Sequence, residues 1–292
     1  MGDIGPTELR LMQGLAQEVT ALRPELLNGD ATVGELAWVW AKDFDALDRF
    51  WRHRMWFANG RLAAWGWVHL PYRVARSDGT LLEVKTASLI WQTHPDRPEL
   101  ISEILDWYDD LAGGVDRLLT VHSADLHAQT TVAAHGYAFD AEAGSDDGPW
   151  VQFNMRELAD VPDPVLPEGY RFLSARDVPA AEAVRAHRDA WHQSSFTEAA
   201  FERVRRTWPY RGDLHVLAAA PDGTLGPTAD QGRAIARGRA SGGDGHQAEG
   251  APDRWRCTHR AGFIRAPPSP TSAPSTSAPH RNFPMMAMSP RT

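Results

Sequence analysis

Cysteine is almost absent from this chain, which holds only one, Cys257, among 292 residues. A single cysteine excludes a disulfide framework and any zinc or iron–sulfur site built from several thiolates. Lysine is also scarce, and acidic side chains outnumber basic ones by 38 to 30, which gives a net charge of −8. An acidic chain is a poor partner for nucleic acid or an anionic membrane surface, so neither is expected as a partner.

Long apolar runs are missing as well. No stretch approaches the length that a bilayer-spanning helix needs, and the chain does not open with a charged stub and an apolar core. These two absences predict a protein without a membrane segment or a secretion signal, and therefore a cytoplasmic one.

Several catalytic and metal-binding motifs are absent too. The sequence contains no G-x-S-x-G, no H-E-x-x-H and no P-loop lysine. Its 12 histidines show no spacing typical of metal ligands, so no metal is predicted.

The composition of the chain changes abruptly at Leu225. Residues 1–224 hold 34 of the 38 acidic groups, whereas residues 225–292 hold nine Arg and four acids. Only five of these last 68 residues are Leu, Ile, Val or Phe, and 17 are Pro or Gly. So little apolar surface cannot offset the entropy of ordering a chain, and residues 225–292 are predicted to be a disordered tail.

A gentler boundary lies at Ala159–Glu168. This stretch has three prolines and three acids in ten residues, which is typical of an extended linker. The chain is therefore divided into residues 1–158, a linker over 159–168, residues 169–224 and the tail.

Hydrophobic periodicity in residues 1–158 predicts a mixture of helices and strands. Asn59-Gly60, between two alternating runs, is the strongest short signal of a β-hairpin. Glu99–Leu111 has the apolar spacing of an amphipathic helix. The other expected elements are helices over Leu11–Leu26 (with a stripe of Leu11, Leu15, Val19 and Leu22) and Asp125–His135, and strands over Glu83–Trp91, Leu118–His122 and Val151–Met155. This order predicts an α/β (α+β) fold with helices on the faces of a sheet.

Particular runs of residues carry more information than the periodicity. In residues 1–158 they are GRLAAWGWVHLP, THPDRPELISEILDW, LLTVHSAD, AAHGY and WVQFNMREL; further on they are LPEGYRFLSARDVPAAEAVRAHRDAW, SSFTEAAFERVRRTWPY and DLHVLAAAPDGT. Together they resemble the GNAT acyltransferase superfamily, and more narrowly its actinobacterial tandem-domain members. The resemblance implies a central mixed sheet with helices on both faces, followed by a partial second copy in residues 169–224. It also implies transfer of an acetyl group from acetyl-CoA, as co-substrate, to the amine of a small molecule or peptide.

The resemblance also points to a cofactor loop. In that superfamily a Q/R-x-x-G-x-G/A loop binds the cofactor's pyrophosphate, because glycines let consecutive N–H groups approach it at a helix N-terminus. The corresponding stretch here is Thr93–Ser102. The cofactor-binding candidates within it are Thr93, His94, Arg97, Leu100 and Ile101. The stretch has no glycine, Pro98 has no N–H, and Asp96 and Glu99 carry the negative charge that a helix start favours without any ligand.

Two residues are candidates for the catalytic acid and base. His135 lies on the expected helix before Gly136, where a superfamily member would carry its proton donor, although a polar residue there can simply cap the helix. Glu83 lies at a strand start where a base for the amine could stand, although an exposed strand-end Glu needs no function.

Three hypotheses about function follow. The first is an acyl-CoA-dependent N-acyltransferase. The second is a catalytically inactive remnant whose reading frame was lost near codon 225, because the tail lacks Val entirely and the second copy stops after Thr224. The third is a ligand-binding or partner-binding module lined by the tryptophans of residues 1–158.

Overall fold

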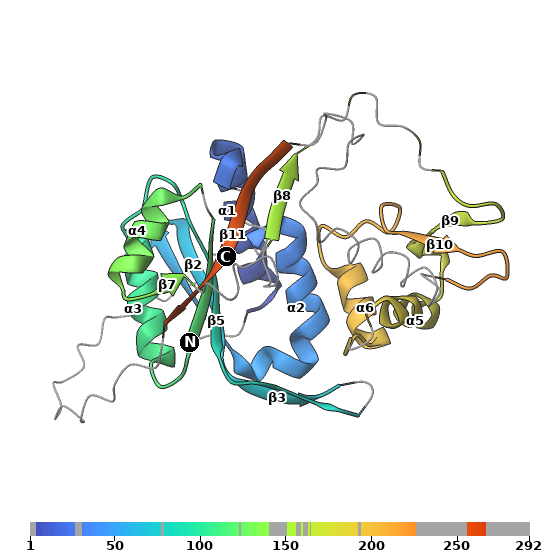
Figure 1. Ribbon diagram of the computed structural model, residues 1–292, viewed down its shortest axis with the longest axis horizontal. Helices are drawn as coiled ribbons and strands as arrows, with labels where there is room; N and C mark the ends of the chain where they lie inside the picture. Colours follow the sequence, from blue (N-terminus) through green and yellow to red (C-terminus); the bar gives the residue numbers. More distant parts are fainter. Residues whose placement is uncertain are drawn as a thin grey trace, which may run out of the picture.

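The computed structural model describes residues 4–26, 31–76, 79–122, 124–139, 151–155, 159, 163, 165–191, 194–225 and 256–266. Most of these residues form two units that lie side by side (Figure 1). The first unit contains a seven-stranded sheet, and the second contains a two-stranded sheet with two helices.

The large sheet is mixed. Its strands are β1 (Trp51–Ala58), β2 (Arg61–His69), β5 (Ala87–Thr93), β6 (Arg117–His122), β7 (Ala138–Phe139), β8 (Val151–Met155) and β11 (Arg256–Ala266). They run in the order β1-β2-β5-β6-β11-β7, with β8 also beside β11. Only β5 and β6 are parallel neighbours, and the other pairs are antiparallel.

The hairpin between β1 and β2 turns at the predicted residues. Asn59 and Gly60 both have positive φ, 52° and 77°. Two such residues form the two-residue turn whose twist matches that of the flanking strands. The prediction of a hairpin at Asn59-Gly60 is therefore confirmed.

Helices cover both faces of this sheet (Figure 1). On one face lie α1 (Pro6–Leu22) and α2 (Val33–Leu47), and on the other lie α3 (Leu100–Ala112) and α4 (Leu126–Ala134). The alternation in β2 separates the two cores: Trp65 and Trp67 are fully buried toward α1 and α2, whereas Ala64 and Val68 are buried toward α3. The predicted mixed sheet with helices on both faces is confirmed.

The first helix differs from its prediction in position. It runs over Pro6–Leu22, and Pro24–Leu26 form a separate 3-10 turn, η1. Leu15 and Val19 of the expected stripe are buried, but Leu11 and Leu22 are exposed. The reason is that, at about 100° per residue, Leu11 and Leu22 lie on nearly the same side of the helix, about 60–100° around it from the buried Met12 and Val19.

The strand expected over Glu83–Trp91 is in fact two strands. Glu83 belongs to β4 (Leu81–Val84), which pairs with β3 (Tyr72–Ala75) in a separate ribbon, and β5 begins only at Ala87. The ribbon extends away from the large sheet (Figure 1). Glu83 is thereby removed from the sheet that it was expected to join.

The second unit has the expected order of strand, helix, helix and strand. It consists of β9 (Arg171–Ser174), the 3-10 turn η4 (Ala175–Asp177), α5 (Ala180–Ala190), α6 (Glu198–Arg206) and β10 (Val216–Ala219). Helix α6 packs on α2, and the two units share one hydrophobic core. Arg203 of α6 binds the carbonyl of Ala41 at 3.1 Å and the carboxylate of Asp45 at 2.6 Å.

One part of the predicted tail is a strand in the structure. Residues 256–266 form β11, which lies between β6 on one side and β7 and β8 on the other. No local pattern in the tail indicates this segment, because its pairing partners lie more than 100 residues away in the chain. The rest of the tail lies outside the described residues, and the division at 158, 168 and 224 stays a prediction.

Within the described ranges, no helix is long and apolar enough to cross a bilayer.

Candidate functional site

A cleft opens where the two parallel strands part. The pairing of β5 with β6 ends at Leu89 and Leu119, although β5 continues to Thr93 and β6 to His122. The loops that follow lead to the starts of α3 and α4. The carboxyl ends of parallel strands that separate in this way are a common place for a ligand in α/β proteins.

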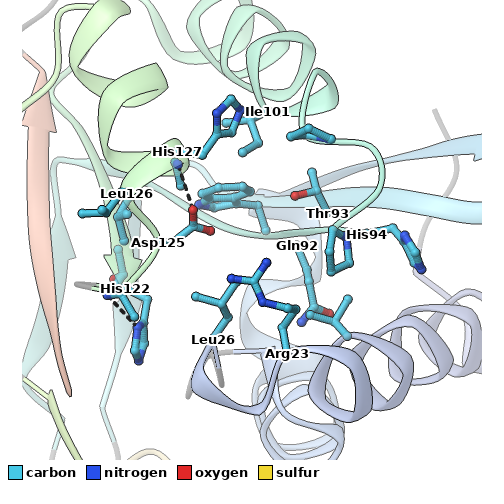
Figure 2. Close-up of a pocket in the computed structure, with 18 residues that line it drawn as sticks. Arg23, Leu26, Gln92, Thr93, His94, Ile101, His122, Asp125, Leu126 and His127 are labelled. Atoms are coloured by element: carbon cyan, nitrogen blue, oxygen red, sulfur yellow. Dashed lines mark hydrogen bonds between the residues drawn. The ribbon is translucent and has the colours of Figure 1, made fainter. Parts of the chain in front are cut away.

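The cleft has a volume of about 350 Å³ and three walls (Figure 2). Its first wall comes from the end of α1 and from η1, its second from β5, the following loop and α3, and its third from the end of β6 and the start of α4. The main lining residues are Val19, Arg23 and Leu26; Trp91, Gln92, Thr93, His94, Pro98 and Ile101; and Val121, His122, Asp125 and His127.

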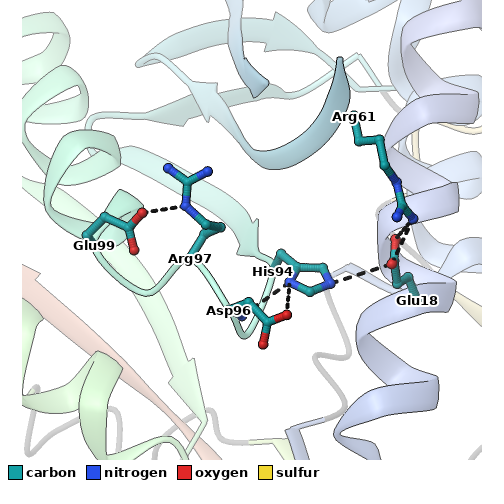
Figure 3. Close-up of polar contacts among 6 residues, drawn as sticks. All are labelled: Glu18, Arg61, His94, Asp96, Arg97 and Glu99. Atoms are coloured by element: carbon teal, nitrogen blue, oxygen red, sulfur yellow. Dashed lines mark hydrogen bonds and ion pairs between the residues drawn. The ribbon is translucent and has the colours of Figure 1, made fainter. Parts of the chain in front are cut away.

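The five predicted cofactor-binding residues are only partly brought together. Thr93, His94 and Ile101 line the cleft. Leu100 is instead buried in the core beneath α3. Arg97 does not line the cleft and forms an ion pair with Glu99, whose carboxyl pKa it lowers through a hydrogen bond (Figure 3).

His94 joins the loop to α1 (Figure 3). Its Nδ1 accepts a hydrogen bond from the backbone N–H of Asp96 at 3.2 Å, and its Nε2 lies 3.5 Å from the carboxylate of Glu18. An accepting Nδ1 places the ring hydrogen of the neutral imidazole on Nε2, facing Glu18. Arg61 holds the same carboxylate at 2.9 Å. Both ring nitrogens of His94 are therefore engaged within the protein.

The backbone of the loop does not fit the pyrophosphate of acetyl-CoA. Three N–H groups of the loop donate within the protein: His94 to the carbonyl of Ala63, Asp96 to His94 Nδ1, and Arg97 to the carbonyl of His94. The first two N–H groups of α3 do so as well, Leu100 to the carbonyl of Arg97 and Ile101 to that of Pro98. Pro95 and Pro98 have no N–H at all. A cradle of consecutive N–H donors, which the resemblance requires, cannot form from these groups.

The predicted catalytic residues both lie outside the cleft lining. Glu83 is on the β3–β4 ribbon, more than half exposed, with its carboxylate 3.9 Å from Lys85. His135 follows the last turn of α4, where its Nδ1 is 2.9 Å from the carbonyl of Thr131 and its Nε2 is 3.3 Å from Asp106. Their geometry is that of a surface ion pair and a helix end, which are the alternatives given above.

Six polar residues that line the cleft were not among the predicted site residues, and three of them, Arg23, Gln92 and Asp125, bear on its charge and hydrogen bonding. Arg23 follows α1 and pairs with Glu25, which raises the pKa of its guanidinium. Asp125 caps α4, its Oδ1 accepting from the N–H of Ala128 at 2.9 Å. Gln92 is only 7% exposed, and its Oε1 is buried without a hydrogen-bond partner among the described residues.

The sequence holds a signal for only one of these three residues. Asp125 is the first residue of the predicted helix, and aspartate is a favoured cap at a helix start. Nothing in the sequence joins Arg23 to residues about 70 and 100 positions away, because the fold alone brings them together. The described residues contain no cluster of three or more His, Cys, Asp or Glu side chains that could hold a metal ion.

No family model matches the sequence, and no curated protein matches it. A GCN5-related N-acetyltransferase from Sphaerobacter thermophilus has a similar structure, with a TM-score of 0.43 and 17% identity over 94% of this chain and 97% of that one. An acetyltransferase of the GNAT family from Streptococcus pneumoniae gives a TM-score of 0.32 and 14% identity over 52% of this chain and 86% of its own.

A third similar structure is a conserved protein of unknown function from Enterococcus faecalis V583, described as a probable N-acyltransferase. Its TM-score is 0.37, with 12% identity over 92% of this chain and 72% of that one. With TM-scores below 0.5, these three likenesses do not assign a function to the chain.

Proposed function

We propose that this chain has the architecture of a GNAT-type N-acyltransferase and that its cleft binds a small ligand without transferring an acyl group from acetyl-CoA. The observation that carries the proposal is the loop between β5 and α3. Three of its N–H groups and the first two of α3 are used within the protein, and two of the loop positions are prolines. A pyrophosphate would find no cradle of donors there, and it would meet the carboxylates of Asp96 and Glu99.

The second unit is part of the same proposal. Residues 169–224 are the first half of a second copy, as the sequence resemblance implies, and their sheet has only two strands. The cleft of the first unit lies between two parallel strands that separate. Because β9 and β10 are antiparallel, this two-stranded sheet cannot form such a cleft.

An acyl-CoA-dependent N-acyltransferase is the second candidate. It is favoured by the parting of β5 and β6 after Leu89 and Leu119, with α3 starting at the mouth of the cleft. On this hypothesis acetyl-CoA would be the co-substrate, and the acceptor would be the amine of a small molecule or peptide.

Titration of the full chain with acetyl-CoA by calorimetry, followed by an acetylation assay on a panel of amines, separates the two candidates. We expect no binding at acetyl-CoA concentrations up to about 1 mM and no acetylated product. Micromolar binding with turnover on any amine would support the acyltransferase and overturn the proposal.

A further inference from the structure

We propose that the cleft between β5 and β6 binds a free amino acid with an apolar side chain, its carboxylate on Arg23 and its ammonium group on Asp125. This inference rests on the proposed function of the cleft as a small-ligand site, and it names the chemical class of that ligand.

Opposite charges face each other across the cleft. Arg23 enters from the end of α1 and Asp125 from the start of α4, and both side chains point into the space between these elements (Figure 2). They form no ion pair with each other in the part of the chain that the structure describes, because Arg23 pairs with Glu25 and Asp125 accepts from Ala128. A ligand that carries one positive and one negative charge can contact both side chains at once and so connect the two walls of the cleft.

Each of the two groups retains capacity for such a ligand. Arg23 uses its Nε for Glu25, which leaves its two terminal nitrogens, and a guanidinium can hold a carboxylate through two parallel hydrogen bonds. Asp125 uses Oδ1 for the cap of α4, which leaves Oδ2 to accept from an ammonium group.

Gln92 adds an independent indication of a polar ligand. Its side chain is more than nine-tenths buried and lines the cleft, yet its amide oxygen has no partner among the described residues. A buried amide oxygen without a hydrogen bond is costly, and a ligand N–H supplies the missing donor. An ammonium group carries three such hydrogens.

The remaining lining sets the size and polarity of the rest of the ligand. Trp91, Ile101 and Val121 are buried apolar residues at the cleft, and Leu26 lies on the facing wall. A volume of about 350 Å³ is at the small end of ligand sites. An aliphatic or aromatic side chain fits this surface and this size.

The charges around the cleft also disfavour the binding of a larger anion such as a pyrophosphate. The cleft is lined by the guanidinium of Arg23 and the carboxylate of Asp125, and Arg23 is paired with the carboxylate of Glu25. A polyanion such as a pyrophosphate is repelled by two of these three groups, whereas a zwitterion has one favourable contact for each of its charges.

The test uses three ligands that differ by one group each. L-phenylalanine carries both charges, 3-phenylpropionate lacks the ammonium group, and 2-phenylethylamine lacks the carboxylate. In calorimetric titrations of the full chain we expect phenylalanine to bind at least about tenfold more tightly than either analogue.

Two variants assign the two charges to their partners. R23Q should abolish the preference for phenylalanine over 2-phenylethylamine, and D125N should abolish the preference over 3-phenylpropionate. Asn is a good helix cap, so D125N retains the start of α4. R97Q is the matched control, because Arg97 pairs with Glu99 two residues on, as Arg23 does with Glu25, but lies outside the cleft lining.

The inference is overturned if phenylalanine does not bind at concentrations up to about 10 mM, or if an analogue binds as tightly as phenylalanine. It is also overturned if R97Q changes the ligand preference as much as R23Q does. Binding of acetyl-CoA would instead contradict the proposed function, and the two failures are distinguishable because each is read from a different titration.

Discussion

The two units of this protein contain similar elements but bury their sheets differently. In the first unit helices cover both faces of the large sheet. In the second, Leu173 and Leu217 face the shared core, whereas Phe172 and Val216 on the other face are about half exposed. Alternating apolar residues on a strand therefore do not ensure that both faces of its sheet are covered. The one covered face of the second unit is buried in a core that it shares with α2 of the first unit.

The largest effect is expected at the core between the units. Phe201 of α6 is 1% exposed and packs within the shared core, so F201A should remove about 3–5 kcal/mol of unfolding free energy. Urea denaturation should show the second unit unfolding before the first. F172A is the matched control, because Phe172 is 47% exposed, and it should cost less than about 1 kcal/mol. Equal losses in the two variants would mean that the second unit does not depend on this contact.

A smaller effect is expected from His69 in the first unit. Burial beside Trp51 and Trp67, together with the charge of Lys42, lowers the pKa of His69 to about 4. Below pH 6.5 this histidine is protonated in the unfolded chain but stays neutral in the folded protein. The free energy of unfolding therefore falls as the pH drops toward 4. The loss should be on the order of 2–3 kcal/mol, and H69Q should remove it from the pH dependence of thermal unfolding. A pH profile that is the same in H69Q would contradict the buried, neutral state of this ring.

The polar contact between the units should contribute less. R203Q removes the hydrogen bond to the Ala41 carbonyl and the ion pair with the half-exposed Asp45, and should cost about 1–2 kcal/mol. R205Q is a control on the same helix, because Arg205 pairs with Glu202 within α6. Chemical denaturation of both variants tests the comparison, which fails if R205Q is the more destabilised of the two.

The smallest effect is expected at the loop that lacks glycine. Arg97 and Glu99 form an exposed ion pair, and such pairs contribute about 0–1 kcal/mol. R97Q should therefore leave the melting temperature within about 2 °C of the parent. A larger fall would show that this pair holds the loop in place.

Local signals made part of the fold predictable. The hairpin turn at Asn59-Gly60 and the helix starting near Leu100 depend on residues close together in sequence, and both are present. The strand β11 was missed because its pairing partners lie more than 100 residues away.

The cleft was harder to predict for the same reason. Thr93, His94 and Ile101 were found through one continuous stretch of sequence, whereas Arg23 and Asp125 come to line the same cleft only after α1 and α4 have packed on opposite faces of the sheet. No local pattern indicates that two such distant side chains will share a cavity.

The most direct test of the account follows the indole N–H of Trp91, which lines the cleft, in a ¹H–¹⁵N spectrum with W91F to assign it. We expect the signal to move on addition of L-phenylalanine and to be unchanged by acetyl-CoA at the same concentration. A shift with acetyl-CoA and none with phenylalanine would contradict the central claim that this cleft binds a small ligand in place of the cofactor.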